Sequence, residues 1–274
     1  DMGRGKGKTH TPVYDLANTK GIPVFQPEKV NSKDSIDYMK GYAPDLLVVA
    51  AYGHILSREI LELGKYGAIN VHASLLPKYR GASPIQSAIL EGERVTGVTI
   101  MRMDAGLDTG DILLQEEIEI SPEETGGSLF ERLSILGGSL ASAAIGDIEG
   151  YEESAHKQDE SQATFTRLID KARGRVDFSK SASSIERMIR AFDPWPGAFS
   201  YLDGKMIKFW RAAAERDESV EAAHGTIISI DERGIGIAAG DGILFVKELQ
   251  MEGRKRMGFS EFLRGKPLKA GMSF

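Results

Sequence analysis

The chain has 274 residues, a formal net charge of −6 and no cysteine. The lack of cysteine excludes disulfide bonds, thiolate metal sites and a cysteine nucleophile. No apolar run approaches the roughly 20 residues that a membrane-spanning helix needs, and no signal peptide is evident, so we expect a cytoplasmic protein that does not bind membranes. The first residue is aspartate rather than methionine, and we expect that an amino-terminal piece is absent from this sequence.

The negative net charge does not favour nucleic-acid binding, so any such role must depend on local basic patches. Taken alone, either of the two patches in this chain is more typical of solvated surface charge. The patches contain Arg4, Lys6 and Lys8 near the start, and Arg254, Lys255 and Arg256 with Arg264, Lys266 and Lys269 near the end.

Alternating strands and helices are predicted for the first 110 residues. Ser57 can cap a helix over residues 58–65, and Ser83 with Pro84 at the first helical position begins another that runs to residue 90. The alternation predicts an α/β fold with a mostly parallel sheet. The expected strands, of which the second is fully buried, cover residues 22–25, 45–50, 68–71 and 97–103.

The next segments predict a sheet edge and a long helix. Residues 112–120 partly alternate between apolar and polar side chains, which indicates an edge strand. Four leucines, from Leu129 to Leu140, recur at helical spacing, so we expect an amphipathic helix over residues 128–145. Gly137 and Gly138 oppose this helix, since each glycine costs about 1 kcal/mol there.

The pattern changes in the last third of the chain. Residues 150–164 are polar and indicate a linker, and a helix that includes Ile185 and Phe192 is expected to end at Asp193. Short strands with glycine-rich turns then predict a small β-barrel of the oligonucleotide-binding (OB) type. Their expected ranges are 198–202, 206–213, 225–231, 234–239 and 242–249. We therefore expect domains at residues 1–150 and 171–274, joined by a linker at 151–170.

Asn70 and His72 end a predicted strand and, being two residues apart, project to one face of it. Asp108 lies in the loop after the next predicted strand, so neighbouring strands could bring it beside His72. An amide donor, an imidazole and a carboxylate can together stabilise an oxyanion and move a proton. The set has no serine or cysteine nucleophile in an elbow motif, which favours direct attack by a substrate amine or by water. The residues alone therefore indicate acyl transfer or hydrolysis.

Residues 70–86, Asn-Val-His-Ala-Ser-Leu-Leu-Pro-Lys-Tyr-Arg-Gly-Ala-Ser-Pro-Ile-Gln, resemble the signature of the 10-formyltetrahydrofolate-dependent formyltransferase family. Residues 106–111, Gly-Leu-Asp-Thr-Gly-Asp, resemble its second signature. Further segments are similar to those of the members that formylate methionyl initiator tRNA. These segments are residues 3–8, 51–53, 97–101, 189–197 and 240–244.

This resemblance implies an amino-terminal Rossmann-like catalytic domain and a carboxy-terminal OB-like domain that binds tRNA. It implies transfer of a formyl group from 10-formyltetrahydrofolate to the α-amine of methionyl initiator tRNA. We also expect no metal, and nothing in the sequence requires more than a monomer. The family also has a strand and a glycine-containing turn before the basic loop, which this sequence lacks. By resemblance, the catalytic residues are Asn70, His72 and Asp108. The folate site is expected to include Ser74, Leu75, Leu76 and Pro77. The residues expected to bind tRNA are Arg4, Lys6, Lys8, Arg254, Lys255 and Arg256.

In the expected mechanism, Asn70 and a protonated His72 donate hydrogen bonds to the oxygen that becomes negative as the amine attacks. Asp108 is expected to raise the pKa of His72 by opposite-charge pairing and to accept the proton of the amine. Activity should then rise with pH and fall once His72 loses its proton. The alternatives are a formyltransferase that acts on an amino sugar nucleotide, a hydrolase that releases formate, and a non-catalytic RNA-binding protein.

Overall fold

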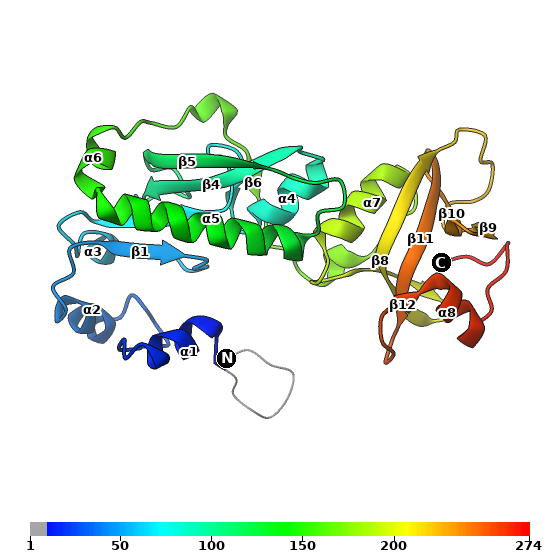
Figure 1. Cartoon of the computed structure of the whole chain (residues 1–274), viewed down its shortest axis with the longest axis horizontal. Helices are drawn as coiled ribbons and strands as arrows, with labels where there is room; N and C mark the ends of the chain where they lie inside the picture. Colours follow the sequence, from blue (N-terminus) through cyan, green and yellow to red (C-terminus); the bar gives the residue numbers. More distant parts are fainter. Residues whose placement is uncertain (1–9) are drawn as a thin grey trace.

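A computed structural model describes residues 10–274, which form a four-stranded and a six-stranded β-sheet joined through a helical region, together with a small two-stranded sheet (Figure 1). Two large hydrophobic clusters of buried residues accompany the two larger sheets, one for each, and a third, small cluster consists of Leu76, Met101 and Ile112. The described part of the chain contains no helix with the length and hydrophobicity that a membrane span requires.

The first sheet has the strand order β1-β2-β4-β5. Its strands are β1 (Leu47–Ala50), β2 (Ala68–His72), β4 (Val95–Arg102) and β5 (Ile112–Glu119). Among the described residues of this sheet, the pair β1–β2 is parallel, whereas β4 runs antiparallel to both of its neighbours. The expected α/β architecture is therefore present, whereas a mostly parallel sheet was a wrong prediction. The strand expected at residues 45–50 is not fully buried, because β1 lies at an edge and Val48 is exposed.

The strand expected at residues 22–25 is also a wrong prediction. These residues pair with no strand among residues 10–274, and the Phe25 ring instead stacks on Tyr38 at 4.1 Å. The helix expected over 58–65 ends early, because Gly64 packs directly against the backbone of Asp45. Ser57 does cap this helix, whereas the Ser83 side chain makes no capping bond. The helices of this half are α1 (Pro12–Thr19), α2 (Lys33–Lys40), α3 (Arg58–Leu61), α4 (Pro84–Glu91), α5 (Gly126–Gly146) and α6 (Ile148–Glu153).

The long helix α5 runs along the first sheet and buries its leucine face against it (Figure 1). The predicted helix is thus confirmed despite its two glycines. Their roles differ, because a Cβ atom at Gly137 would lie 2.9 Å from Cγ1 of Val71, while a Cβ at Gly138 would meet nothing within 4 Å. Gly137 therefore allows the helix to approach strand β2, and this contact turns Asn70 and His72 toward the opposite face.

We expect Gly137→Ala to lower the free energy of unfolding by about 1–3 kcal/mol, because the added methyl group overpacks the contact with Val71. Gly138→Ala is the matched control, and helix propensity predicts that it stabilises the protein by roughly 0.5–1 kcal/mol. Urea unfolding of the two variants at 25 °C measures both changes. Equal stabilisation by the two substitutions would contradict the close approach of α5 to the sheet.

The second sheet has the order β7-β8-β11-β10-β9, with β12 paired to β11, and its neighbouring strands are antiparallel. The five predicted strands are confirmed, but within residues 10–274 no pairing between β7 and β9 closes the sheet into a barrel. The elements are α7 (Ala182–Ala191), β7 (Ala198–Leu202), β8 (Lys205–Arg216), β9 (Ile227–Asp231), β10 (Gly234–Ala239), β11 (Gly242–Met251), β12 (Met257–Gly258) and α8 (Phe259–Gly265). Met188 of α7 packs against both hydrophobic clusters and so connects the two halves.

The polar segment expected to be a linker folds back onto the first half. The short strand β6 (Phe165–Thr166) pairs in parallel with β3 (Arg80–Gly81). The backbone of His156 also pairs with Ile112 at the start of β5. The segment also contains the short 3-10 helix η1 (Glu160–Gln162), and a second one, η2 (Ala172–Gly174), follows it. It is therefore part of the wall around the candidate site described next.

Candidate active site

Strand β2 presents Asn70 and His72 on the face opposite α5. Ile69 and Val71 of the same strand belong to the hydrophobic cluster beneath the helix, so the alternate residues must point away from it. Along a strand, residues two apart are separated by about 6.6 Å. The two polar side chains therefore share one region at the carboxyl end of the strand.

His72 is buried, with a side-chain exposure of 6%, and both ring nitrogens have defined surroundings. Nε2 lies 3.0 Å from the carbonyl oxygen of Tyr79. A carbonyl oxygen only accepts hydrogen bonds, so we assign the proton of the neutral ring to Nε2. Nδ1 then carries a lone pair, and it lies 3.7 Å from Oδ2 of Asp108.

Asp108 is held in the loop between β4 and β5. Its Oδ2 accepts a 2.7 Å hydrogen bond from the backbone N–H of Gly81, which ties the loop to β3. Its own backbone has φ +52°, a left-handed conformation that costs energy for a residue other than glycine. The side chain of Gln158 donates to the carbonyl oxygen of Asp108 at 2.8 Å. The predicted convergence of Asp108 and His72 is thus a feature of this structure.

Burial lowers the pKa of His72 below its usual value, and the Asp108 carboxylate and the Tyr79 carbonyl offset this effect only in part. The imidazole is therefore neutral at pH 7. The expectation that Asp108 would keep His72 protonated was wrong, because loss of solvation outweighs the attraction to the carboxylate. A neutral ring with a free Nδ1 can accept a proton there.

This ionisation state changes the expected pH dependence. Both the imidazole and an attacking amine are in their reactive, neutral forms at high pH, so kcat/KM should rise with pH and reach a plateau. Steady-state rates between pH 5.5 and 9 measure this. A fall above pH 7, as a protonated imidazole requires, would contradict the neutral state of His72.

The Asn70 side chain is half-buried and has no hydrogen-bond partner among residues 10–274. Half-buried amides usually find partners in the protein or in water. An amide N–H that is not used internally is available to an oxygen atom of a bound substrate. This is the property that the predicted oxyanion donor requires.

The segment expected to line the folate site, residues 74–77, is bonded internally. Thr99 Oγ1 donates to the Ser74 carbonyl at 2.7 Å and accepts from the backbone N–H of Leu76 at 3.2 Å. The remaining carbonyls of the segment accept from the backbone N–H of Lys78, the Gln115 side chain and the backbone N–H of Thr164. Ser74 and Leu76 are buried, while Leu75 and Pro77 are half-buried. The segment is therefore a rigid wall rather than a loop with free carbonyl groups.

The residues expected to contact tRNA fall into two groups. Arg4, Lys6 and Lys8 lie outside the described residues. In the second group, Arg256 forms ion pairs with Asp193 at 2.8 Å and Glu248 at 2.7 Å, and Lys255 lies 3.8 Å from Glu261. Arg254 is exposed and, in the part of the chain described, has no carboxylate partner.

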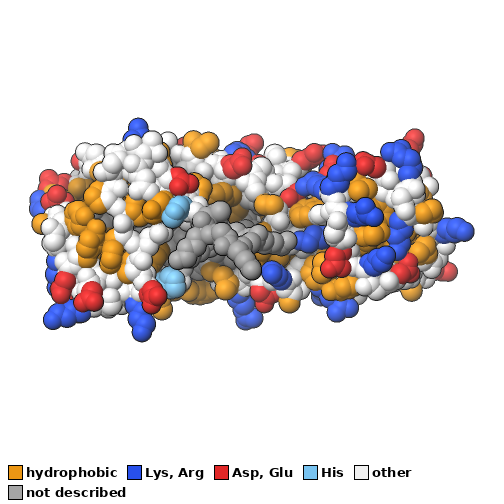
Figure 2. Space-filling model, turned by 90° about the horizontal axis from the view of Figure 1, so that it is seen from below, with side chains coloured by type: hydrophobic (Ala, Val, Ile, Leu, Met, Phe, Trp, Pro, Cys, Tyr) orange, Lys and Arg blue, Asp and Glu red, His pale blue; other side chains and the backbone are white. Residues whose placement is uncertain are grey.

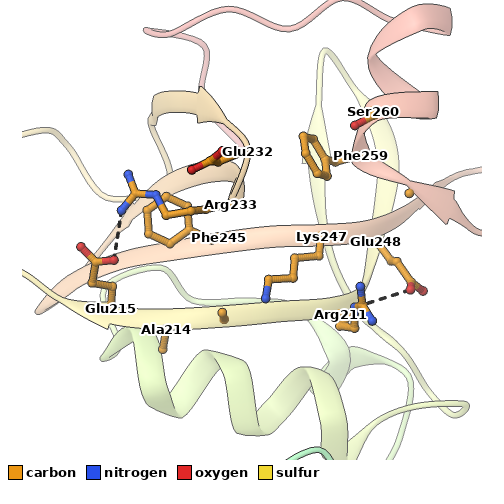
Figure 3. Close-up of a pocket in the computed structure, with 12 residues that line it drawn as sticks. Arg211, Ala214, Glu215, Glu232, Arg233, Phe245, Lys247, Glu248, Phe259 and Ser260 are labelled. Atoms are coloured by element: carbon orange, nitrogen blue, oxygen red, sulfur yellow. Dashed lines mark hydrogen bonds and ion pairs between the residues drawn. The ribbon is translucent and has the colours of Figure 1, made fainter.

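On the face seen in Figure 2, Lys and Arg side chains gather over the half that contains the second sheet. A groove of about 640 Å³ is lined by residues of β8, β11 and α8 (Figure 3). Arg211 pairs with Glu248 and Arg233 pairs with Glu215 in this groove, so carboxylates offset much of its positive charge. We assign no ligand to it.

Three site-supporting residues were not among the predicted ones: Arg80, Gln158 and Glu160. Arg80 is inside the signature segment, but nothing in the sequence indicates that it is buried. Gln158 and Glu160 lie in the polar stretch expected to be a linker, and no pattern there signals a contact with the site. Among residues 10–274, no cluster of three or more His, Asp or Glu side chains could hold a metal ion.

Comparisons with known proteins match nearly the whole chain. A family model described as formyl transferase matches residues 1–145, and one for the formyl transferase carboxy-terminal domain matches residues 168–267. A methionyl-tRNA formyltransferase of Lachnospira eligens is 44% identical over 274 residues, covering 98% of this chain and 87% of the relative.

Two solved structures share the fold at lower identity. WlaRD, a sugar 3N-formyl transferase, is 20% identical with a TM-score of 0.62 and covers 89% of this chain and 82% of its own. HypX from Aquifex aeolicus, solved in complex with tetrahydrofolic acid, is 19% identical with a TM-score of 0.59 and covers 86% of this chain and 41% of its own.

Proposed function

The chain belongs to the formyl transferase family, and on this premise we propose that it transfers a formyl group from 10-formyltetrahydrofolate to the α-amine of methionyl initiator tRNA. The relative from Lachnospira eligens, whose name specifies a methionyl-tRNA substrate, supports this acceptor over an amino sugar. The sugar formyltransferase is only 20% identical and supports the fold alone.

The observation that carries the proposed chemistry is the pair formed by His72 Nδ1 and Asp108 Oδ2. Both atoms are hydrogen-bond acceptors, and they lie 3.7 Å apart in a buried setting. Two facing acceptors are satisfied by a proton donor that reaches both of them. An amine nitrogen, which must lose a proton as it is acylated, is such a donor.

The side chains fit the reacting groups in the following way. The bound folate would supply an activated formyl group, whose carbon is attacked by the neutral amine and whose oxygen becomes more negative. The free amide of Asn70 would donate a hydrogen bond to that oxygen. Nδ1 of His72 would take the proton from the amine, and the Asp108 carboxylate would stabilise the resulting imidazolium. As the bond between the formyl carbon and N10 of the folate breaks, this proton would pass to N10, so that tetrahydrofolate leaves and the imidazole returns to its neutral form.

The rest of the substrate is proposed to bind on both sides of this centre. Residues 74–77 would form one wall of the folate site through their fixed shape, in line with their internal hydrogen bonds. The tRNA would contact the basic amino-terminal residues and the half with the second sheet, where Arg254 is a cation without a carboxylate partner among the residues described. These backbone contacts would position the acceptor end without reading sequence. We also propose that the second sheet corresponds to the OB-like domain.

Formyl transfer is tested with the purified chain, 10-formyltetrahydrofolate and methionyl initiator tRNA, with mass spectrometry of the released amino acid. We expect formylmethionine to appear at a rate proportional to enzyme concentration. Amino sugar nucleotides and a reaction without acceptor serve as controls. Formylation of the sugar alone, formate release alone, or tRNA binding without turnover would each overturn the proposal.

A further inference from the structure

Arg80 is the largest fully buried side chain of the protein that the structure describes, with an exposure of 1%. Its guanidinium makes two kinds of contact. Nε and Nη2 donate to Oε1 of Gln158 at 3.1 and 2.8 Å, and Nη1 and Nη2 donate to the Glu160 carboxylate at 2.9 and 2.7 Å. A buried guanidinium needs such partners, because an unpaired buried charge is strongly destabilising.

Gln158 is buried between this guanidinium and the loop that carries Asp108. Since arginine has no acceptor, Arg80 fixes the oxygen of the Gln158 amide toward itself and the nitrogen away. That nitrogen donates to the carbonyl oxygens of Asp108 and Gly110, both at 2.8 Å. Every polar atom of the Gln158 side chain is thereby used, and the amide has one orientation.

The residue that Gln158 holds is in a left-handed backbone conformation. Asp108 has φ +52°, which aspartate tolerates better than most residues, and its surroundings add hydrogen bonds that fix this geometry. The backbone of Asp108 is bonded by Gln158, while its carboxylate is bonded by the N–H of Gly81, the residue next to Arg80. Arg80 and its neighbour thus fix Asp108 from two directions.

On the basis of the function proposed above, we propose that Gln158 is a positioning residue that, oriented by Arg80, places the Asp108 carboxylate against Nδ1 of His72. Gln158 touches neither substrate nor reacting atoms in this arrangement and acts through Asp108. The segment after α6 thereby contributes to the proton-accepting pair.

The charged groups around Arg80 and His72 determine how a substitution of Gln158 can change the pKa of His72. Glu160, Asp108 and Asp104 act on Arg80, while Asp108 is the one charged group among residues 10–274 that acts on His72. Because Asp108 raises the pKa of His72 against the effect of burial, we expect that moving the Asp108 carboxylate away, with the ring still buried, lowers that pKa further. A merely structural role of Gln158 would leave the pKa of His72 where it is.

The primary test is NMR titration of the His72 ring in Gln158→Leu, which keeps the size of the side chain and removes its hydrogen bonds. Gln162→Leu is the matched control, because Gln162 lies four residues on and donates only to the exposed Asp159. We expect the His72 titration in Gln158→Leu to move to lower pH, toward the position in Asp108→Asn, and to stay unchanged in Gln162→Leu. An unchanged titration in folded Gln158→Leu would overturn the proposal. This titration needs no substrate, so it remains decisive even if formyl transfer is not the reaction.

Kinetics provide the second readout. Misplacing a reacting group by about 1 Å can cost up to roughly 100-fold in rate, so we expect kcat of Gln158→Leu to fall roughly 10- to 100-fold while the KM values stay within about threefold. If Gln158→Leu does not fold, Gln158→Glu tests the proposal instead. Its carboxylate still accepts hydrogen bonds from Arg80, but it has no N–H to donate to the carbonyl oxygens of Asp108 and Gly110. A similar loss of kcat in folded Gln158→Glu supports the proposal, and wild-type kcat would overturn it.

Discussion

Asp108→Asn is expected to lower kcat by about 10²–10⁴, the range that general acid–base catalysis contributes. The substitution keeps the shape of the side chain and its acceptor for the N–H of Gly81, but removes the charge that stabilises a protonated His72. Single-turnover formyl transfer with enzyme in excess measures this loss directly, since it separates chemistry from product release.

Asp111→Asn is the control for Asp108→Asn. Asp111 follows in the same loop, and its side chain makes no hydrogen bond with the residues described. We expect near wild-type turnover from it. Equal losses from the two substitutions would show that the loop, and not the charge beside His72, accounts for the effect.

Asn70→Ala is expected to lower kcat/KM by about 10²–10³, the usual effect of removing one oxyanion donor. The stability of the fold should change little, because the Asn70 amide bonds to nothing within residues 10–274. Rates at limiting substrate, together with the unfolding temperature, separate the two effects.

Asn70→Asp sharpens this test, because it preserves size while placing a carboxylate beside the oxygen that becomes negative. We expect a larger loss than for Asn70→Ala. Activity that equals or exceeds that of Asn70→Ala would mean that the amide N–H is not directed at the reacting oxygen. Binding of methionyl-tRNA should be nearly unchanged in both variants.

Local sequence patterns predicted many elements of this protein correctly. The leucine spacing predicted α5. The short apolar runs with glycine turns predicted strands β7 to β11 of the second sheet. These patterns report which face of an element is buried, and that is a local property. The direction of β4 is not local, since an apolar run has the same appearance in a parallel or an antiparallel strand.

Part of the site was predictable from the sequence, namely the residues whose position follows from the alternation of side chains along a strand or from the loop that follows a strand. The spacing of Asn70 and His72 placed them on one face, and the loop after β4 brought Asp108 to His72. The role of residues 158–166 was not predictable, because polar side chains that bond a distant buried arginine resemble those of a solvated linker. The protonation of His72 was wrongly predicted, since burial is set by the whole fold.

The proposed chemistry depends on a neutral His72 that carries its proton on Nε2 and accepts the proton of the amine at Nδ1. Nitrogen NMR of the labelled imidazole at pH 7 tests it most directly, because protonated and unprotonated ring nitrogens have different chemical shifts. We expect one protonated nitrogen, assigned to Nε2, and one unprotonated nitrogen, assigned to Nδ1. A doubly protonated ring at pH 7, or a neutral ring with its proton on Nδ1, would contradict it.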